Sequence, residues 1–404
     1  MRILIITNKF PYPPKDGGVI AKLAIITGLY QSNCQITVAS MNTLKHYTDP
    51  DTLPQNIKKM ADFRAHKTNT NISILTALKN LIFSKLPYNA ERFINKDFSN
   101  FLIKILKEKE FDIIQLEGLY LCPYIQTVKK ITNTPVSYRA HNIEHEIWDR
   151  TVENTDNPIK KWYLKILAER LKKFEKNFIN KYDFLVPISH RDASILNSYG
   201  NTKPFHVCQT GIEISKTTLA PALDNTPTLF HLGGLDWTPN QQGLIWFLDN
   251  CWETIIALMP ELIFRIAGRN APDWFINKIT QFKNVEFCDE IADASQFFAD
   301  NTIMVVPLLA GSGMRIKIIE GMAYKKAIIS TSIGAEGIDA IHKKEIFIAN
   351  SATEFIEGVN YLLKNPDEIS IIAENAYNFV SEKFNNTILT KDLLKFYESN
   401  IPNA

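Results

Sequence analysis

The residues with the clearest chemical potential lie in one short segment of the second half of the chain. There, Gly311-Ser312-Gly313 is followed by Arg315, Lys317 and Glu320. Glycines let backbone N–H groups approach a ligand closely, and two cations at the start of a helix suit a phosphate or diphosphate. A carboxylate one turn later suits the hydroxyl groups of a ribose. A solvated first turn with an internal Arg–Glu pair would give the same pattern without a ligand.

The flanking residues predict the elements that position this segment. Ile303 to Val306 is a short β-branched run typical of a buried strand, and Ala327 to Thr331 is another. Between them, apolar residues recur at helical spacing: Ile316, Ile319, Met322 and Ala323. In such strand–helix–strand units, ligands lie beyond the carboxyl ends of the strands.

Two further loops of the second half follow predicted strands in the same way. Gly233 and Gly234 follow the strand predicted at 228–232, and Arg269 follows the strand predicted at 262–267. We therefore count them with Gly311, Ser312, Gly313, Arg315, Lys317 and Glu320 as candidate ligand-binding residues.

The first half begins with another strand–loop–helix pattern. Arg2 to Thr7 predicts a strand, and Asp16-Gly17-Gly18 opens a helix predicted at 19–31. Asp16 is a natural helix cap, and this loop is a candidate contact for a phosphate or a sugar. The loop lacks the GxGxxG pattern of dinucleotide-binding proteins.

Polar residues also follow two later strands of the first half. Glu117 ends the strand predicted at 112–116, and His141, Asn142 and Glu144 follow the strand predicted at 135–138. Because parallel strands end at one edge of a sheet, we expect these residues to lie near one another. A lone histidine is more often structural, but its place at a strand end favours a chemical role for His141 over His145.

Composition indicates two or three α/β domains without a membrane span. The chain has 404 residues, of which 45% are hydrophobic, and no apolar run reaches the roughly 20 residues that a bilayer requires. Its five scattered cysteines form no CxxC motif, which favours reduced thiols and a cytoplasmic location. The pair Asp49 and Asp51 lies in a predicted loop and is interpreted as a turn, so no metal site is expected.

Charge is distributed unevenly along the chain. Residues 1–216 hold 31 lysines and arginines against 20 acidic residues, and the remainder holds 14 against 23. A basic half could contact anionic lipid, a phosphorylated acceptor or nucleic acid, but nucleic acid is disfavoured because no interleaved basic–aromatic motif is present. Residues 78–88, LKNLIFSKLPY, could contact an acceptor or a membrane. The basic amphipathic helix predicted at 157–182 could contact a membrane surface. Packing in the protein core is the preferred interpretation of their apolar residues.

The segment from Pro307 to Ile338 resembles the donor-site segment of retaining glycosyltransferases of the GT-B fold, family four, in particular a bacterial surface-glycan subgroup. GGLDWTPN, IAGR and VEFCDE precede it in the family's order, and RAHNIEHE, residues 139–146, resembles the subgroup's His-Asn segment. Most of the family has a glutamate where Ser312 stands, which leaves open the donor-sugar contact usually given to that position.

The resemblance implies two Rossmann-like domains facing each other across a cleft. These would be an acceptor-binding domain at 1–214, a nucleotide-sugar-binding domain at 228–385 after a linker at 215–227, and a C-terminal helix within 386–404 that crosses back to the first domain. Arg315 and Lys317 would stabilise the departing diphosphate, Glu320 would hold the ribose, and His141 would lie near the transferred bond. Acceptor or cleft contacts would come from Asp16, Gly17, Gly18, Glu117, Asn142 and Glu144.

The resulting hypothesis is a hexosyltransferase that needs no metal or other cofactor. It would move a sugar from a nucleotide diphosphate sugar to a hydroxyl of a glycan or a lipid-linked acceptor, with retained anomeric configuration, in surface polysaccharide synthesis at the inner face of a membrane. Alternatives are a nucleotide-sugar-binding protein without transfer activity and a hydrolase or phosphorylase on the same fold. The sequence identifies no catalytic base.

Overall fold

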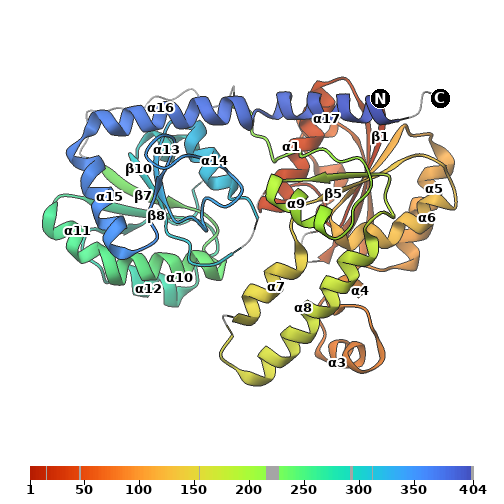
Figure 1. Ribbon diagram of the computed structural model, residues 1–404, viewed down its shortest axis with the longest axis horizontal. Helices are drawn as coiled ribbons and strands as arrows, with labels where there is room; N and C mark the ends of the chain where they lie inside the picture. Colours follow the sequence, from red (N-terminus) through yellow and green to blue (C-terminus); the bar gives the residue numbers. More distant parts are fainter. Residues whose placement is uncertain are drawn as a thin grey trace. The chain divides into compact units, whose positions relative to one another are not determined.

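The computed structural model describes residues 1–14, 16–44, 47–153, 155–214, 227–291, 294–311 and 313–401. The chain forms two compact units (Figure 1). The first contains Met1–Gly211 and Asn386–Ala404, and the second contains Ile212–Asn385. The linker predicted at 215–227 falls almost wholly outside the described residues.

The first unit is built on a six-stranded parallel sheet of order β3-β2-β1-β4-β5-β6. Its register pairs Thr7 with Glu117 and Glu117 with Arg139, which brings the carboxyl ends of the three central strands together. The strands are β1 (Arg2–Thr7), β2 (Gln35–Thr43), β3 (Asp62–Thr68), β4 (Ile113–Glu117), β5 (Val136–Ala140) and β6 (Phe184–Pro187).

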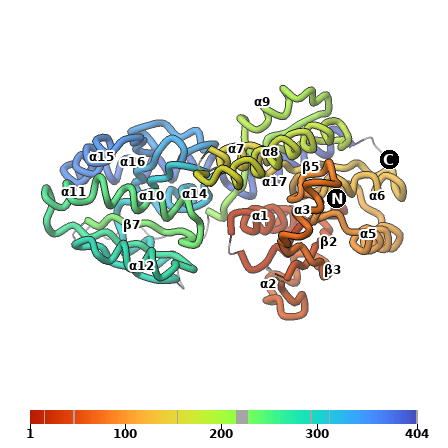
Figure 2. The backbone as a smooth tube through the Cα atoms, turned by 90° about the horizontal axis from the view of Figure 1, so that it is seen from below, coloured from red at the N-terminus to blue at the C-terminus, as the bar shows by residue number. Residues whose placement is uncertain are grey.

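Helices cover both faces of this sheet. The C-terminal helix α17 (Asn386–Asn400) packs against α1 (Gly17–Gln31) so closely that a Cβ on Gly28 would lie 2.1 Å from Thr390 Oγ1 (Figures 1 and 2). The other helices are α2 (Gln55–Lys58), α3 (Ile74–Phe83), α4 (Tyr88–Glu91), α5 (Lys96–Glu108), α6 (Ile125–Lys129), α7 (Glu144–Glu153), α8 (Pro158–Phe178) and α9 (His190–Ser198), with 3₁₀ turns at Pro50–Thr52 and Leu119–Tyr124.

The second unit has a parallel sheet of order β12-β11-β10-β7-β8-β9. Its strands are β7 (Thr228–Leu232), β8 (Ile263–Ala267), β9 (Val285–Phe287), β10 (Ile303–Val306), β11 (Ala327–Ser330) and β12 (Phe347–Ile348). Its helices are α10 (Thr238–Phe247), α11 (Glu253–Leu258), α12 (Asp273–Ile279), α13 (Ala294–Ala299), α14 (Ile316–Ala323), α15 (Ala352–Lys364) and α16 (Pro366–Lys383), with a π-helical turn at Leu248–Trp252 between α10 and α11. Apolar cores lie on both faces of the sheet.

Two segments form structure that their local sequence does not indicate. β3 is an edge strand whose polar residues leave no apolar run. The apolar residues near 206–209 form no strand, and the chain makes only single hydrogen bonds along β6 there, such as His206 N–H to the Leu185 carbonyl.

No helix in the described ranges is long and apolar enough to cross a bilayer. The five cysteines are free thiols, and Cys288 alone among them is not buried.

Candidate functional site

In the second unit, three loops meet at the carboxyl edge of the sheet. A Cβ on Gly268, after β8, would lie 1.7 Å from the Gly233 carbonyl oxygen, after β7. A Cβ on Gly243, in α10, would lie 2.2 Å from the Pro307 carbonyl, after β10. Only glycine permits these approaches, and they bring the loops after β7, β8 and β10 close to the start of α14.

Lys317, in the first turn of α14, is held at this edge by neutral groups. Its Nζ donates to Asn240 Oδ1 at 2.6 Å and lies 3.2 Å from His231 Nε2. His231 Nδ1 donates to the Val305 carbonyl at 2.8 Å, so Nε2 is the acceptor nitrogen of the neutral ring. Burial, and then the nearby charge of Arg315, lowers the Lys317 pKa to about 7.

Arg315 is folded back onto the glycine loop. Its guanidinium lies 5.5 Å from the centre of the Trp237 ring and donates to the Gly313 carbonyl. A Cβ on Gly311 would lie 2.6 Å from the Arg315 guanidinium, and the φ of 129° at Gly311 also disfavours a side chain. Gly311 and Gly313 therefore both lie against the Arg315 side chain.

Glu320 lies one turn further along α14. Burial raises its pKa to about 7. Within the described ranges its side chain makes no hydrogen bond or ion pair, so its carboxyl group is available to a ligand.

The structure thus brings together most of the predicted residues of this half. A Cβ on Gly233 would lie 3.0 Å from Lys317 Nζ, and one on Gly234 would lie 3.7 Å from Arg269 Nε. Ser312 lies outside the described residues. His231 and Asn240 were not among the predicted residues, although a histidine within the apolar strand TLFHL was a usable signal.

In the first unit, Glu117 is the centre of a buried polar network. Its Oε2 accepts from Arg139 at 3.1 Å and from His141 Nε2 at 2.6 Å, and its Oε1 accepts from the Gln115 amide. Burial alone would raise the Glu117 pKa, but Arg139 and His141 outweigh it and hold the pKa at about 2. Burial lowers the pKa of His141, so the neutral ring keeps its proton on Nε2 and presents Nδ1 as an acceptor.

The C-terminal helix completes this network. Tyr397 OH lies 2.8 Å from Gln115 Oε1 and 2.9 Å from Ser137 Oγ. Because Gln115 Oε1 accepts from this hydroxyl, its amide N–H group is directed at Glu117. Hydrogen bonds therefore link Tyr397 to His141 through Gln115 and Glu117.

Two lysines flank the Asp16 loop. Asp16 caps α1 by accepting from the Val19 N–H at 3.0 Å, and Lys9 Nζ lies 2.7 Å from its carboxylate. Burial would raise the Asp16 pKa, but Lys9 lowers it. Lys22 Nζ donates to Asn8 Oδ1 at 2.5 Å, and burial, then Lys9, lowers its pKa to about 7. Gly17 and Gly18 form the first residues of α1 beside this cluster.

Glu144 and Asn142 form a neighbouring cluster. Tyr120 OH donates to Glu144 Oε2 at 2.8 Å, and burial raises the Glu144 pKa to about 7, whereas hydrogen bonds from Tyr120 and Asn142 lower it. The backbone N–H of Glu144 donates to Glu175, which also pairs with buried His145 at 2.6 Å. His145 therefore has a structural partner at Nδ1, whereas His141 Nδ1 has no hydrogen-bond partner among the described residues.

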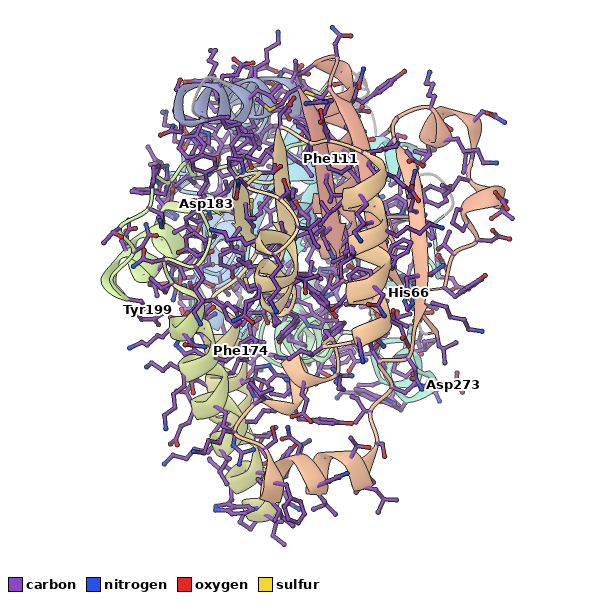
Figure 3. All side chains as sticks on the ribbon, turned by 90° about the vertical axis from the view of Figure 1, so that its right-hand side faces the viewer. His66, Phe111, Phe174, Asp183, Tyr199 and Asp273 are labelled. Carbon is purple, nitrogen blue, oxygen red and sulfur yellow. The ribbon has the colours of Figure 1, made fainter. Side chains whose placement is uncertain are left out.

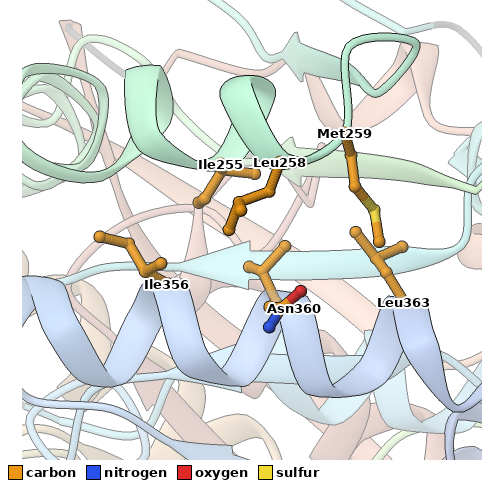
Figure 4. Close-up of a pocket in the computed structure, with 7 residues that line it drawn as sticks. Ile255, Leu258, Met259, Ile356, Asn360 and Leu363 are labelled. Atoms are coloured by element: carbon orange, nitrogen blue, oxygen red, sulfur yellow. The ribbon is translucent and has the colours of Figure 1, made fainter.

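Two further pockets, one in each unit, lie away from these residues. A recess between α11 and α15 is filled by Ile255, Leu258, Met259, Ile356 and Leu363 and has no room for water (Figure 4). A cavity of about 360 Å³ lies at the amino end of β1, beside Arg2. Within the described residues, no group of three or more His, Cys, Asp or Glu residues is arranged to hold a metal ion.

Comparison with known proteins relates the chain to glycosyltransferases. Residues 226–365 match the family model described as Glycosyl transferases group 1. An uncharacterised 44.6 kDa protein of the cps region of Klebsiella pneumoniae is 26% identical over 305 residues, which cover 73% of this chain and 76% of that protein.

Two solved structures share the fold over nearly the whole chain. Anabaena HepE, in complex with UDP, superposes with a TM-score of 0.68 at 15% identity, covering 99% of this chain and 100% of HepE. Sucrose-phosphate synthase from Thermosynechococcus elongatus gives 0.71 at 14% identity, covering 98% of each chain. The protein therefore has the GT-B fold and carries, at residues 226–365, a domain of the glycosyl transferases group 1 family.

Proposed function

We propose that this protein is a retaining glycosyltransferase that moves a hexosyl group from a nucleotide diphosphate sugar to a hydroxyl. The observation that carries the proposal is the placement of Lys317 beside Arg315 at the start of α14. Its hydrogen-bond partners, Asn240 and His231, are neutral, so within the described residues the partly buried ammonium group of Lys317 has no compensating negative charge in an ion pair. A diphosphate would supply that charge.

The chemistry follows from the bond that breaks. As the bond between the anomeric carbon and the phosphate oxygen lengthens, negative charge grows on the leaving diphosphate. Arg315, Lys317 and the positive end of the α14 dipole would stabilise that charge. We propose that these groups serve in place of a metal ion, and that Glu320 and Arg269 hold the ribose and the phosphates.

The first unit would supply the sugar and acceptor contacts. His141 offers Nδ1 to a sugar hydroxyl while Glu117 fixes its ring. Asp16, Gly17, Gly18, Asn142 and Glu144 line the same sheet edge and remain candidates for contacts with the acceptor. Glu117 is only 1% exposed, which favours a positioning role over direct acceptor contact.

Two comparisons support the choice of substrates. HepE was solved with UDP, so a uridine nucleotide is the first donor to test. The Klebsiella relative is named for a cps region, which fits synthesis of a surface polysaccharide on a glycan or lipid-linked acceptor at the cytoplasmic side of a membrane.

Thermal stabilisation by UDP, GDP, ADP and CMP and their sugars, in EDTA, tests the donor site. A shift from one nucleotide identifies the base. The absence of any shift would overturn the donor site.

His141→Ala then tests transfer, with His190→Ala, an exposed position on α9, as the matched control. The proposal expects His141→Ala to keep the donor-induced thermal shift and to lose transfer. If wild type binds a donor but transfers nothing to any acceptor, the protein is a binding module. If wild type releases free sugar at the same rate without an acceptor, it is a hydrolase.

A further inference from the structure

Helix α3 exposes an apolar face that no core residue covers. Leu75 is 81% exposed and Phe83 is 80% exposed, and Ile72, Ile74, Leu78 and Ile82 are exposed as well. The interpretation that the apolar residues of 78–88 pack in the core is therefore wrong for Leu78, Ile82, Phe83 and Leu86. Single exposed apolar residues are common, but a contiguous group of this kind marks an interaction surface.

Hydrogen bonds and apolar packing attach one side of α3 to the rest of the first unit. Arg170 of α8 donates to the Asn80 and Leu81 carbonyls at 3.2 and 2.8 Å. Asn80 Nδ2 donates to Glu91 and to the Leu86 carbonyl, and Ala77 packs on the cluster of Tyr88, Leu164 and Leu167. The polar and small residues of α3 thus fix it to the unit, and its large apolar residues are exposed. Figure 3 shows side chains projecting away from the unit at its lower end, where α3 lies in Figure 1.

The beginning of α8 extends this surface. Ile159 and Trp162 are exposed in the first turns of α8, before Leu164 and Leu167 of the cluster on which Ala77 packs. Five exposed lysines accompany the apolar residues, and neither 72–88 nor 157–167 contains an acidic residue. The lysines are Lys79, Lys85, Lys160, Lys161 and Lys165.

We propose that residues 72–86 and 159–165, the α3–α8 surface, dock the protein onto an anionic lipid bilayer. Leucine, isoleucine and phenylalanine side chains would enter the boundary between headgroups and acyl chains, as the apolar faces of interfacial helices do. Trp162 suits the same boundary, and the lysines would meet anionic headgroups. A protein partner would need acidic residues placed to match these lysines. An anionic bilayer offers both negatively charged headgroups and apolar acyl chains in one surface.

The docking surface is distinct from the donor-site residues, so the two can be tested separately. We would measure flotation of the full-length protein with vesicles of phosphatidylcholine alone and of phosphatidylcholine with phosphatidylglycerol. We expect binding to the anionic vesicles, weaker binding to the neutral ones, and release as salt is raised. Failure to float with anionic vesicles at low salt would overturn the proposal.

A matched pair of variants assigns the binding to this surface. The double variant Leu75→Ser/Phe83→Ser should lose at least about tenfold in partition. Leu258→Ser/Ile371→Ser removes apolar residues that are 55% and 51% exposed in the second unit and should float like wild type. Equal flotation of the α3 variant and wild type contradicts the proposal.

Charge provides an independent test. Lys160→Gln/Lys161→Gln should weaken binding to anionic vesicles by about fivefold per lysine, and Lys364→Gln/Lys383→Gln should not. Light scattering completes the set, because a wild-type dimer that the α3 variant makes monomeric would assign the surface to self-association instead. Nucleotide-induced thermal shifts that persist in every variant show that the donor site is intact, whatever the flotation result.

Discussion

The carboxyl edges of the two sheets differ in the partners of their charged side chains. At the edge of the first unit, Glu117 is neutralised by Arg139, and Asp16 is paired with Lys9. At the edge of the second unit, Lys317 is held by Asn240 and His231, which carry no charge. At the first edge both carboxylates are paired with cations, and Lys22, although bound to neutral Asn8, lies near Asp16 and Glu117. At the second edge, the hydrogen-bond partners of Lys317 among the described residues include no carboxylate.

This difference separates two kinds of functional residue. An internally paired network keeps its shape whether or not a substrate is bound, so it is suited to orienting a side chain such as His141. An uncompensated cation costs stability in the free protein and strengthens an interaction with an incoming anion. The comparison predicts that variants of the first edge lower stability most, whereas variants of the second edge lower activity most.

The largest effect is expected from Glu117→Gln. This change leaves Arg139, which is 1% exposed, as a buried charge without its partner, so we expect a loss of about 3–5 kcal/mol in the free energy of unfolding. Urea denaturation at neutral pH measures it. Glu374→Gln, which breaks a surface pair with Lys325, is the control and should cost about 0–1 kcal/mol.

The pKa of Glu117 sets the pH at which this contribution disappears. Because its folded pKa is held at about 2, below the ordinary value of 4.5, the stability that ionised Glu117 contributes is present above pH 4.5. It is lost as the pH falls through 2. If Glu117→Gln unfolds at the same urea concentration as wild type at pH 7, the first edge is not an internally compensated network.

The next largest effect is expected from Lys317→Met. Removal of a cation that stabilises a leaving group typically lowers turnover by about 10²–10³-fold, and loss of an uncompensated buried charge should leave thermal stability unchanged or slightly higher. Transfer assays on folded protein measure the first quantity and calorimetry the second.

Lys326→Met is the matched control for this variant. Lys326 is also a buried lysine of the second unit, but its Nζ donates to the Asn301 carbonyl at 2.8 Å, away from α14. It should change stability without changing turnover per folded molecule. Full activity in Lys317→Met would remove the distinction between the two edges.

A smaller effect is expected on the pH dependence of anion binding. In the free protein the Lys317 pKa is about 7, and a bound anion should raise it. Binding of pyrophosphate therefore takes up a proton above pH 7, and affinity should fall with rising pH by up to about tenfold per unit. Calorimetric titration measures this slope, and Lys317→Met should flatten it. A wild-type slope equal to that of Lys317→Met would show that Lys317 does not face the anion.

For ligands with a ribose, Glu320 should give affinity the opposite pH dependence, because its carboxylate forms as the pH rises. Its pKa of about 7 means that the carboxylate, which accepts from hydroxyl groups, is lost below pH 7. A nucleoside diphosphate should therefore bind best near pH 7, whereas the affinity for pyrophosphate should level off below pH 7, where Lys317 is already protonated. Glu320→Gln should remove that difference between the two ligands.

Strands, helices and polar residues at strand ends could be predicted from the sequence, because they follow from the local order of apolar and polar residues. The strand at Ile303–Val306, the helix at Ile316–Ala323 and the polar residues at the ends of β4 and β5 were found from apolar runs and from the residues that interrupt them. Glycine at 233, 268 and 311 marks close approaches that only the folded chain reveals in detail.

The remaining features depend on contacts between distant residues. Lys317 is separated from Asn240 by 77 positions and from His231 by 86, so no local pattern reports their hydrogen bonds. The apolar periodicity of α3 shows that one face is hydrophobic, but only tertiary packing decides whether that face is covered. For the same reason, the sequence marked Glu117 as polar and accessible at a strand end without revealing that Arg139, on the neighbouring strand, pairs with it.

The smallest effect tests whether the C-terminal helix contributes to the first edge. Tyr397→Phe removes the hydroxyl that hydrogen-bonds Gln115 and Ser137 and should lower the free energy of unfolding by about 1–1.5 kcal/mol. If Tyr397 orients Gln115 toward Glu117, the variant should also shift the His141 imidazole resonances in NMR spectra and lower transfer at saturating donor. Tyr361→Phe, a half-exposed tyrosine on α15, is the matched control. A variant with the expected stability loss but unchanged His141 resonances would confine Tyr397 to packing, and the network of the first edge would then end at Gln115.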